Sequence, residues 1–190
     1  MRNLIVVVTM FITAATNAQF NFPVDSTTNK ICYSQIVKVD SANKSEIFNR
    51  AIDWTSLNYK SANDVIQLKD IDRGKIIIKG IFELDRKTWQ HTIIIEVKDG
   101  RCRIKTTNLI YTINAGTSSA KDCSIEEMIV NRINDEKDPR LQAKFTQADF
   151  DRMHLIRKEG DEALDKKIKE ILASFSAAMQ TDISRKEEKW

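Results

Sequence analysis

Two stretches in the middle of the chain alternate between apolar and polar residues, and they predict neighbouring β-strands. Lys75 to Leu84 and His91 to Lys98 show the period of two that is typical of a strand with one buried face. Asp99-Gly100 follows, and this dipeptide favours a tight type I′ turn whose twist matches that of the strands it joins. The turn fixes the register of the hairpin, with Lys98 opposite Arg101. The residues predicted to share its core-facing side are Ile93, Ile95, Val97, Cys102 and Ile104.

Other segments carry equally simple patterns. Residues 31–39 and 65–68 also have strand character, and the strand after the hairpin turn continues to about residue 113. In residues 44–58 the apolar positions recur every three or four residues, and Asn43 with Glu46 forms a capping box, so this segment is a predicted helix. Ser124 and Glu127 form the same signal at the start of a second helix.

The C-terminal part of the chain is predicted to be helical. Pro139 marks a boundary in a charged segment, and Thr146 caps a helix that Gly160 then interrupts. A further amphipathic helix of about five turns begins at Asp161. Its apolar positions are Leu164, Ile168, Ile171, Leu172, Phe175 and Met179. We expect this helix to dock on its own sheet or on the first helix.

In chain order the predicted elements are a strand, a helix, four strands, a helix and a helical C-terminal extension. We therefore expect an α+β fold in which a five-stranded antiparallel sheet is covered by helix on one face and exposed to water on the other. The predicted organisation is a signal peptide over residues 1–18, an α+β domain over residues 19–134 and the helical extension over residues 135–190.

The first eighteen residues have the pattern of a secretory signal peptide. Arg2 supplies a positive charge, an apolar run extends from Leu4 to Ala15, and small residues precede a predicted cleavage between Ala18 and Gln19. The apolar run is too short for a membrane-spanning helix. We expect an exported protein, periplasmic or secreted, without a membrane span in the mature chain.

Charge and cysteine content argue against several classes of protein. The chain has 30 basic and 27 acidic residues and a formal net charge of +3 at pH 7, which is far from the strongly basic character of a nucleic-acid binder. We therefore expect no nucleic-acid partner. The three cysteines, Cys32, Cys102 and Cys123, allow at most one disulfide, so the chain is not a disulfide-rich scaffold.

Several short motifs between Phe22 and about Arg132 are similar to those of a known family. They are Phe22-Pro23-Val24-Asp25, Lys30-Ile31-Cys32-Tyr33-Ser34, Val37-Lys38-Val39, Arg50-Ala51 with Trp54, Lys60-Ser61-Ala62, Gly74-Lys75-Ile76 with Gly80, and Lys98-Asp99-Gly100-Arg101. On these motifs the segment resembles exported bacterial proteins of the Bacteroidota type, a domain of unknown function with a TATA-binding-protein-like (TBP-like) fold. Cys102 stands where that family usually has an aromatic residue.

The resemblance implies a TBP-like α+β domain followed by a helical tail with an Ala-Met pair, here Ala178-Met179. None of the shared motifs is catalytic. Because a fold does not by itself imply a function, the fold label carries no expectation of DNA binding.

The sequence contains no recognisable catalytic or metal-binding constellation. His91 and His154 lie on unlike elements and in no metal-ligand frame, and the five isolated glycines form no phosphate-binding loop. Cys123 precedes a predicted helix N-terminus, where the helix dipole lowers a thiol pKa, but packing against Met128 is the favoured explanation of its position. We therefore expect no cofactor, no metal ion and no enzymatic activity.

The exposed face of the predicted sheet carries a basic patch. The alternation places on it Lys75, Lys79, Lys98, Arg101, Arg103 and Lys105. Trp89 lies in a predicted connection, Asp85 to Gln90, where an aromatic side chain is available for contacts. Such a surface suits an anionic glycan, a lipid head group or an acidic envelope protein. The alternative is a solvated sheet face whose charges discourage edge pairing.

Three functions remain open at this point. The leading interpretation is a non-enzymatic binding or structural module of the cell envelope. The second is a cystatin-like protease inhibitor or peptide-binding module, because a helix held by an antiparallel sheet suits that architecture, although the turn from Lys69 to Gly74 lacks a Q-x-V-x-G hairpin. The third is an unrecognised hydrolase that uses Cys123 or His91.

Overall fold

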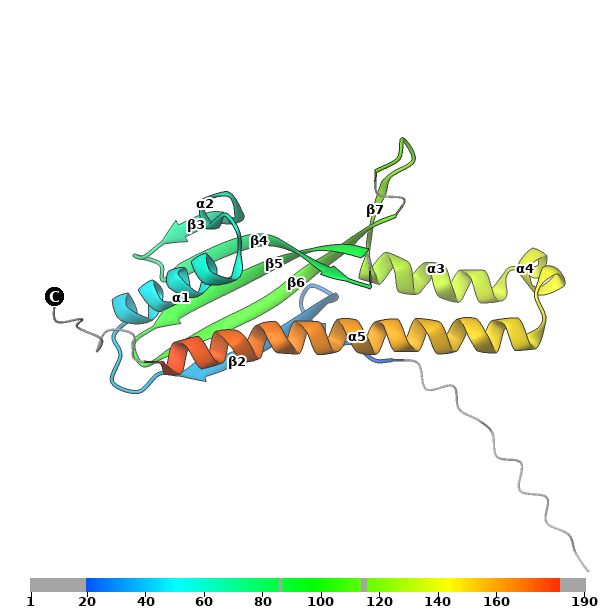
Figure 1. The fold of residues 1–190 in the computed structure, drawn as a ribbon. Helices are drawn as coiled ribbons and strands as arrows, with labels where there is room; N and C mark the ends of the chain where they lie inside the picture. Colours follow the sequence, from blue (N-terminus) through cyan, green and yellow to red (C-terminus); the bar gives the residue numbers. More distant parts are fainter. Residues whose placement is uncertain (1–19, 86, 114–115, 182–190) are drawn as a thin grey trace, which may run out of the picture.

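An antiparallel sheet forms the centre of the molecule (Figure 1). The computed structural model describes residues 20–85, 87–113 and 116–181, so the predicted signal peptide and the bond between Ala18 and Gln19 lie outside the described residues. The strands are β1 (Val24–Asp25), β2 (Lys30–Lys38), β3 (Ile66–Asp70), β4 (Lys75–Leu84), β5 (Lys87–Lys98), β6 (Arg101–Ile113) and β7 (Lys121–Ser124).

The strand order confirms the predicted fold class. The sheet runs β1-β2-β6-β5-β4-β3, and β7 pairs with the end of β6. Every pairing is antiparallel. The described part of the chain forms seven strands where five were predicted, because β1 and β7 are too short to show an alternating pattern.

The predicted hairpin at Asp99-Gly100 has the expected register. Lys98 pairs with Arg101 and Ile95 pairs with Ile104. The turn itself is not the predicted type I′, because Gly100 has a positive φ of 70° but Asp99 does not have the positive φ that this type also requires. One boundary was wrong, because β5 begins at Lys87 and not at His91. Four residues predicted to form a connection therefore continue the ladder with β4.

The helices begin where their capping residues predict. Helix α1 (Lys44–Asn58) has the complete Asn43–Glu46 capping box, and in α3 (Ile125–Lys137) the backbone N–H of Glu127 donates to the Ser124 hydroxyl. Short helices α2 (Ala62–Val65) and α4 (Pro139–Lys144) join longer elements. Helix α5 (Gln147–Gln180) is the longest element that the structure describes.

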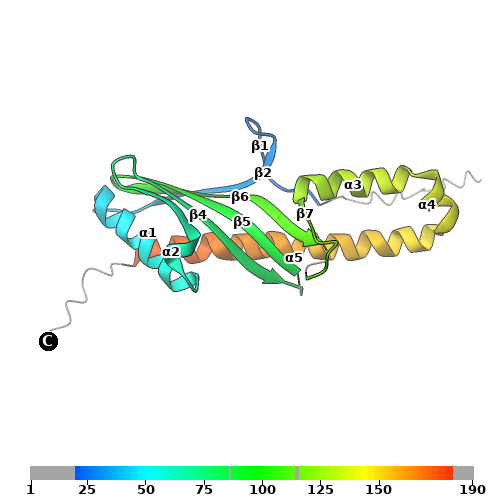
Figure 2. The ribbon, with the colours of Figure 1, turned by 90° about the horizontal axis from the view of Figure 1, so that it is seen from above.

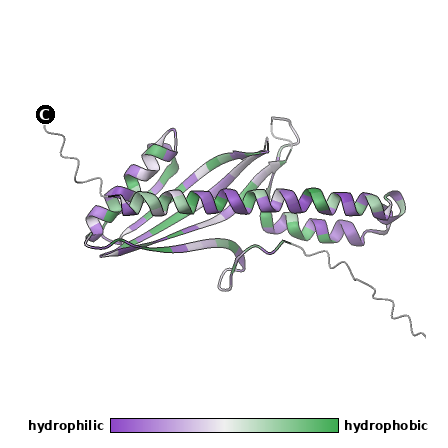
Figure 3. Cartoon of the chain, turned by 60° about the horizontal axis from the view of Figure 1, so that its bottom comes forward, coloured by the Kyte–Doolittle hydropathy of each residue, from purple (hydrophilic) through white to green (hydrophobic). Residues whose placement is uncertain are grey.

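Helices α1 and the C-terminal half of α5 cover one face of the sheet, here called the inner face (Figures 1 and 2). The core lies between them, and Figure 3 shows α5 crossing the sheet on this side. Trp54 of α1 and Phe175 of α5 stack edge to face with ring centroids 5.2 Å apart. The Arg50 guanidinium also donates to the carbonyl oxygen of Met179 at 2.7 Å. The helical extension therefore docks on its own sheet and first helix, as expected.

Gly160 does not interrupt the C-terminal helix, which is a correction to the prediction from sequence. Helix α5 continues through it as one helix of 34 residues. A glycine inside a helix costs about 1 kcal/mol relative to alanine. The neighbouring Asp161 and Leu164 are both buried and pack against other elements, and these contacts offset that cost.

The first half of α5 forms a hairpin with α3 and α4 that projects beyond the sheet (Figure 1). Its base is a buried ion pair in which Nη1 of Arg132 donates to the two carboxylate oxygens of Asp161 at 2.7 and 3.0 Å. Further out, Nη1 of Arg157 donates to Oε1 of Glu136 at 3.0 Å. These contacts join α3 to α5 at the point where α5 leaves the sheet.

Removing the charge of Asp161 is expected to destabilise this junction. Because Asp161→Asn leaves the Arg132 guanidinium half-satisfied in a partly buried position, the free energy of unfolding should fall by about 1.5–3 kcal/mol. Glu162→Gln is the matched control, since Glu162 is the exposed neighbour and forms only a 4.0 Å contact with Lys158. Urea denaturation measures both, and equal small losses would contradict a structural role of the Arg132 pair.

Candidate functional site

No helix of the described residues covers the face of the sheet opposite α1 and α5, here called the outer face (Figure 2). Strand alternation places the basic residues predicted from sequence there, because positions two apart along a strand point to the same side. Cross-strand pairing then puts Ile36, Arg103, Glu96 and Lys75 in one row across four strands. Lys38, Arg101 and Lys98 form the next row.

These two rows enclose a shallow depression of about 460 Å³, here called the cationic depression. It lies where the β5–β6 turn and the β3–β4 turn end the sheet. Its lining residues are Ile36, Arg73, Lys75, Glu96, Val97, Lys98, Arg101, Cys102 and Arg103. Five of them are basic and one is acidic, so the depression has a clear excess of positive charge.

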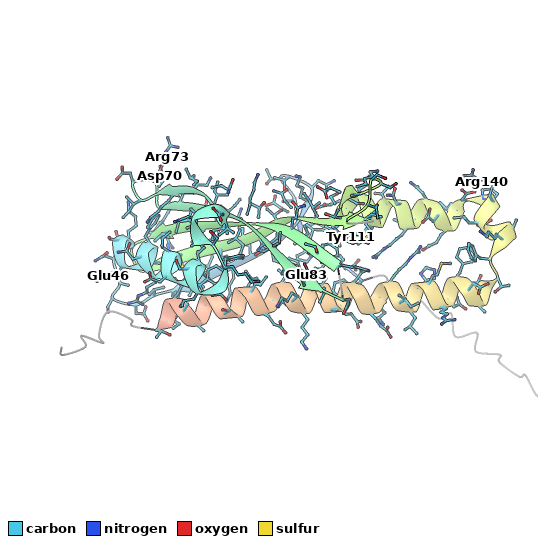
Figure 4. The ribbon with its side chains drawn as sticks, turned by 45° about the horizontal axis from the view of Figure 1, so that its top comes forward. Glu46, Asp70, Arg73, Glu83, Tyr111 and Arg140 are labelled. Atoms are coloured by element: carbon cyan, nitrogen blue, oxygen red, sulfur yellow. The ribbon has the colours of Figure 1, made fainter. Side chains whose placement is uncertain are left out.

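The charges of the depression are unequally neutralised. Nε of Arg103 donates to Oε2 of Glu96 at 2.7 Å, which satisfies both side chains. Arg73 lies 3.6 Å from the Asp70 carboxylate, and Figure 4 shows the two next to each other on the side of the sheet away from α5. Within the described part of the chain, no carboxylate lies within ion-pair distance of Lys98 or Arg101. These two cations are therefore available to an anion.

Six of the seven residues predicted for this surface lie on the outer face, but only some of them meet. Four of them line the cationic depression: Lys75, Lys98, Arg101 and Arg103. Lys79 and Lys105 share its face but lie further along β4 and β6. The outer face is thus basic over most of its length, with the highest concentration of charge at one end.

Trp89 is not part of this surface, which corrects the prediction. It is only 5% exposed and faces the inner side of β5, where its ring lies 5.6 Å from that of Tyr111. The prediction failed because β5 begins before Trp89, so the residue follows the alternation of the strand and not that of a loop.

Arg73 and Ile36 are two of the lining residues that were not predicted from sequence. Arg73 belongs to the β3–β4 turn, and its position beside the β5–β6 turn requires the strand order β5-β4-β3. Ile36 lies on the polar face of β2 and is 66% exposed. An isoleucine among the polar positions of an alternating strand is the signal that could have found it.

His91, one of the two residues that the hydrolase hypothesis proposes as catalytic, lies in the core. Its Nε2 is 2.8 Å from the Tyr59 hydroxyl, while its Nδ1 has no hydrogen-bond partner in the described structure. Burial lowers the pKa of His91 to about 4 and raises the pKa of Tyr59. Gly80 makes room for this pair, because a Cβ there would lie 2.3 Å from Cε1 of Tyr59. The imidazole is buried beside the Tyr59 ring and does not face solvent, from which a substrate would approach.

The cysteines offer no exposed, activated thiolate. Cys123 is buried in β7, and burial together with the nearby Glu127 raises its thiol pKa, although its place before a helix N-terminus led us to expect the opposite. Burial raises the pKa of Cys102 to about 12. All three cysteines are free thiols.

The second histidine does not join the first. His154 lies on the projecting hairpin, with Nε2 3.7 Å from a carboxylate oxygen of Glu136. No cluster of three or more histidine, cysteine or acidic side chains able to hold a metal ion occurs in residues 20–85, 87–113 and 116–181. None of the helices in these same segments is long and apolar enough to cross a bilayer.

Comparison with known proteins finds similarity at the level of family and fold. Residues 33–112 match the model of DUF4468, a domain of unknown function with a TBP-like fold. A crystal structure of a TBP-like protein from Parabacteroides distasonis aligns with a TM-score of 0.56 and 18% identity, covering 83% of this chain and 96% of that one. A DUF4468 family protein from Bacteroides ovatus aligns with a TM-score of 0.48 and 15% identity, covering 81% and 90%. No curated protein matches the sequence significantly.

The family match covers helix α1, strands β3 to β5 and most of β2 and β6, which together form most of the sheet. The alignment to the Parabacteroides distasonis structure extends well beyond these residues, since it covers 83% of the chain. The resemblance drawn from the sequence motifs is therefore confirmed: residues 33–112 match the DUF4468 model, and the fold of the chain is TBP-like.

Proposed function

We propose that this protein is an exported, non-enzymatic binding module of the cell envelope whose outer sheet face takes an anionic ligand. The observation that supports it is the cationic depression, in which Lys98 and Arg101 have no carboxylate partner among the described residues. The pattern of residues 1–18 supports export.

The chemistry of the depression suits a ligand with anionic groups. The two rows lie two residues apart along the strands, about 6.8 Å, and their cations match anions that repeat along a chain or cluster on one group. Glu96 holds the Arg103 guanidinium in place on the floor of the depression. An anionic glycan, a lipid head group and an acidic envelope protein all offer such groups. A sulfated glycan and anionic lipid vesicles distinguish the first two of these ligand classes.

The test uses two probes: heparin, as a sulfated glycan, and vesicles of phosphatidylglycerol. The double variant Lys98→Gln/Arg101→Gln should bind the preferred probe about tenfold more weakly, because two charged contacts of about 0.5–1 kcal/mol each are lost. Binding should also weaken as salt concentration rises. Isothermal titration measures the glycan and vesicle co-sedimentation measures the lipid.

The matched control removes the same charge elsewhere. Lys137→Gln/Lys166→Gln changes two exposed lysines of α3 and α5, far from the outer face in sequence and fold. This variant should bind as the wild type does. Equal losses in both double variants would show unspecific attraction to net charge, and no binding to either probe would contradict the proposal.

A further inference from the structure

The two edges of the sheet differ in how well they are protected. Edge strand β3 has five residues, an irregular register between Ile66 and Leu68, and charged residues at its end. Short length, bulges and charges are devices that keep an edge from pairing with another chain. Edge strand β2 has nine residues and pairs with β6 in regular register from Cys32 to Lys38. It therefore presents a more regular edge.

The hydrogen bonds of β2 show which backbone groups point outward. The N–H of Val39 donates to the carbonyl oxygen of Gly100 at 2.9 Å, so odd-numbered residues bond to β6. Even-numbered residues then direct their N–H and C=O groups away from the sheet. The N–H of Cys32 confirms this, because it donates outward to Pro23 at 2.9 Å.

The unpaired part of this edge is short and centred on one residue. Pro23 covers Cys32 at one end, and at the other the Gln180 side chain donates to the carbonyl oxygen of Lys38 at 2.6 Å. Between them, the outward N–H and C=O groups of Ser34 and Ile36 have no partner within the described structure. The open stretch runs from Ser34 to Lys38, and Ile36 is its midpoint.

We propose that a second copy of this chain pairs with this edge, antiparallel and about a two-fold axis at Ile36, so that two sheets join into one. This inference goes beyond the proposed function and does not depend on it. In this register Ile36 exchanges two backbone hydrogen bonds with Ile36 of the second copy. Ser34 exchanges two with Lys38 on each side of the axis, where the carbonyl of Lys38 has a second lone pair available.

Self-pairing fits the side chains as well as the backbone. Ile36 is 66% exposed in the single chain, and directly opposed isoleucines bury apolar surface that now faces water. Lys38 faces Ser34 and not another cation, so no like charges are opposed. Strand β1 pairs with β2 only at Ile31 and Lys30, beyond the end of the open stretch. Seen from above in Figure 2, β2 forms the rim of the sheet and α5 lies beneath the sheet and not beyond this rim.

Joining the sheets has an electrostatic consequence. The outer faces of both copies become continuous, and Lys38, Arg101 and Arg103 of each lie within two strands of the axis. Their mutual repulsion opposes pairing at low salt, and salt screens it. The dimer should therefore strengthen as salt concentration rises, which is opposite to the behaviour of an interface held by ion pairs.

Sedimentation equilibrium of the purified protein tests this up to about 1 mM, a range that includes weak interfaces. We expect a monomer–dimer equilibrium in the wild type. Ile36→Lys should weaken it tenfold or more, since two lysines would then face each other at the axis. Ile81→Lys is the matched control, because Ile81 is 64% exposed on the outer face but lies on β4, which β5 and β6 separate from β2, and should leave the dimer intact.

A crosslinking experiment gives a second measurement of the register. Opposed residues at a hydrogen-bonded antiparallel position have Cα atoms about 5.5 Å apart, within the range that a disulfide spans. In a Cys32→Ser background, Ile36→Cys should therefore form a covalent dimer on mild oxidation, whereas Ile81→Cys should not. A monomer at every concentration and salt, a dimer that Ile36→Lys leaves unchanged, or equal crosslinking of the two cysteine variants would overturn the proposal.

Discussion

Replacing Phe175 by alanine is expected to lower the free energy of unfolding by about 3–5 kcal/mol. The phenyl ring is completely buried between α5 and the inner face and stacks edge to face on Trp54 at 5.2 Å. The variant loses the transfer free energy of the ring, leaves a cavity that a rigid sheet cannot close, and loses the aromatic pair. For a chain of this size the loss corresponds to a fall of about 10 °C in Tm.

The matched control for Phe175→Ala lies on the same helix. Leu155 is more than half exposed in the projecting hairpin, so Leu155→Ala should change the free energy of unfolding by no more than about 0.5 kcal/mol. Urea denaturation followed by circular dichroism measures both. If Phe175→Ala cost less than about 1 kcal/mol, the C-terminal half of α5 would not be part of the core.

Much of the fold could be predicted because its signals are local. The Asn43–Glu46 capping box and the Asp99-Gly100 turn each determine nearby backbone hydrogen bonds. The capping box is complete and the hairpin has the predicted register. The start of β5 could not be predicted in this way. The local pattern around Trp89 predicts a polar connection, but long-range pairing with β4 and β6 extends the strand through these residues. Tertiary contacts overrode the local pattern there.

Gly160 shows the same limit for helices. Its local effect is to weaken a helix by about 1 kcal/mol relative to alanine. The contact that maintains α5 comes from Arg132, 28 positions earlier on α3. Because this contact is long-range and leaves no local pattern in the sequence of α5, the continuity of the helix could not be predicted from the sequence.

The basic side chains of the candidate site were found by alternation alone, because residues two apart on a strand share a face. Their convergence with Arg73 and Ile36 required the strand order, which places four separate segments at one end of the sheet. The exclusion of Trp89 required the true strand boundary. The sequence thus predicted the chemistry of the outer face but not its most concentrated part.

Acidification is expected to destabilise the protein through His91. The pKa of this buried imidazole is about 4 in the folded chain and 6.5 in an unfolded one. Between these values the unfolded state binds a proton that the folded state does not, so stability is complete above pH 6.5 and falls as the pH is lowered towards 4. A shift of this size corresponds to about 3 kcal/mol. Its physical cause is burial, and in the described structure no acceptor lies beside Nδ1 to stabilise the charged ring.

Two histidine variants separate this effect from the general acid sensitivity of carboxylates. His91→Gln keeps a polar group beside the Tyr59 hydroxyl but cannot titrate, so its free energy of unfolding should decline less steeply between pH 6.5 and pH 4 than that of the wild type. His154→Gln removes the other histidine, which lies on the projecting hairpin, and should retain the steep decline. Urea denaturation at a series of pH values measures all three proteins. If the slope of His91→Gln equalled that of the wild type, the imidazole would already be hydrated and protonatable in the folded state, and the core beneath Gly80 and Tyr59 would be open to water.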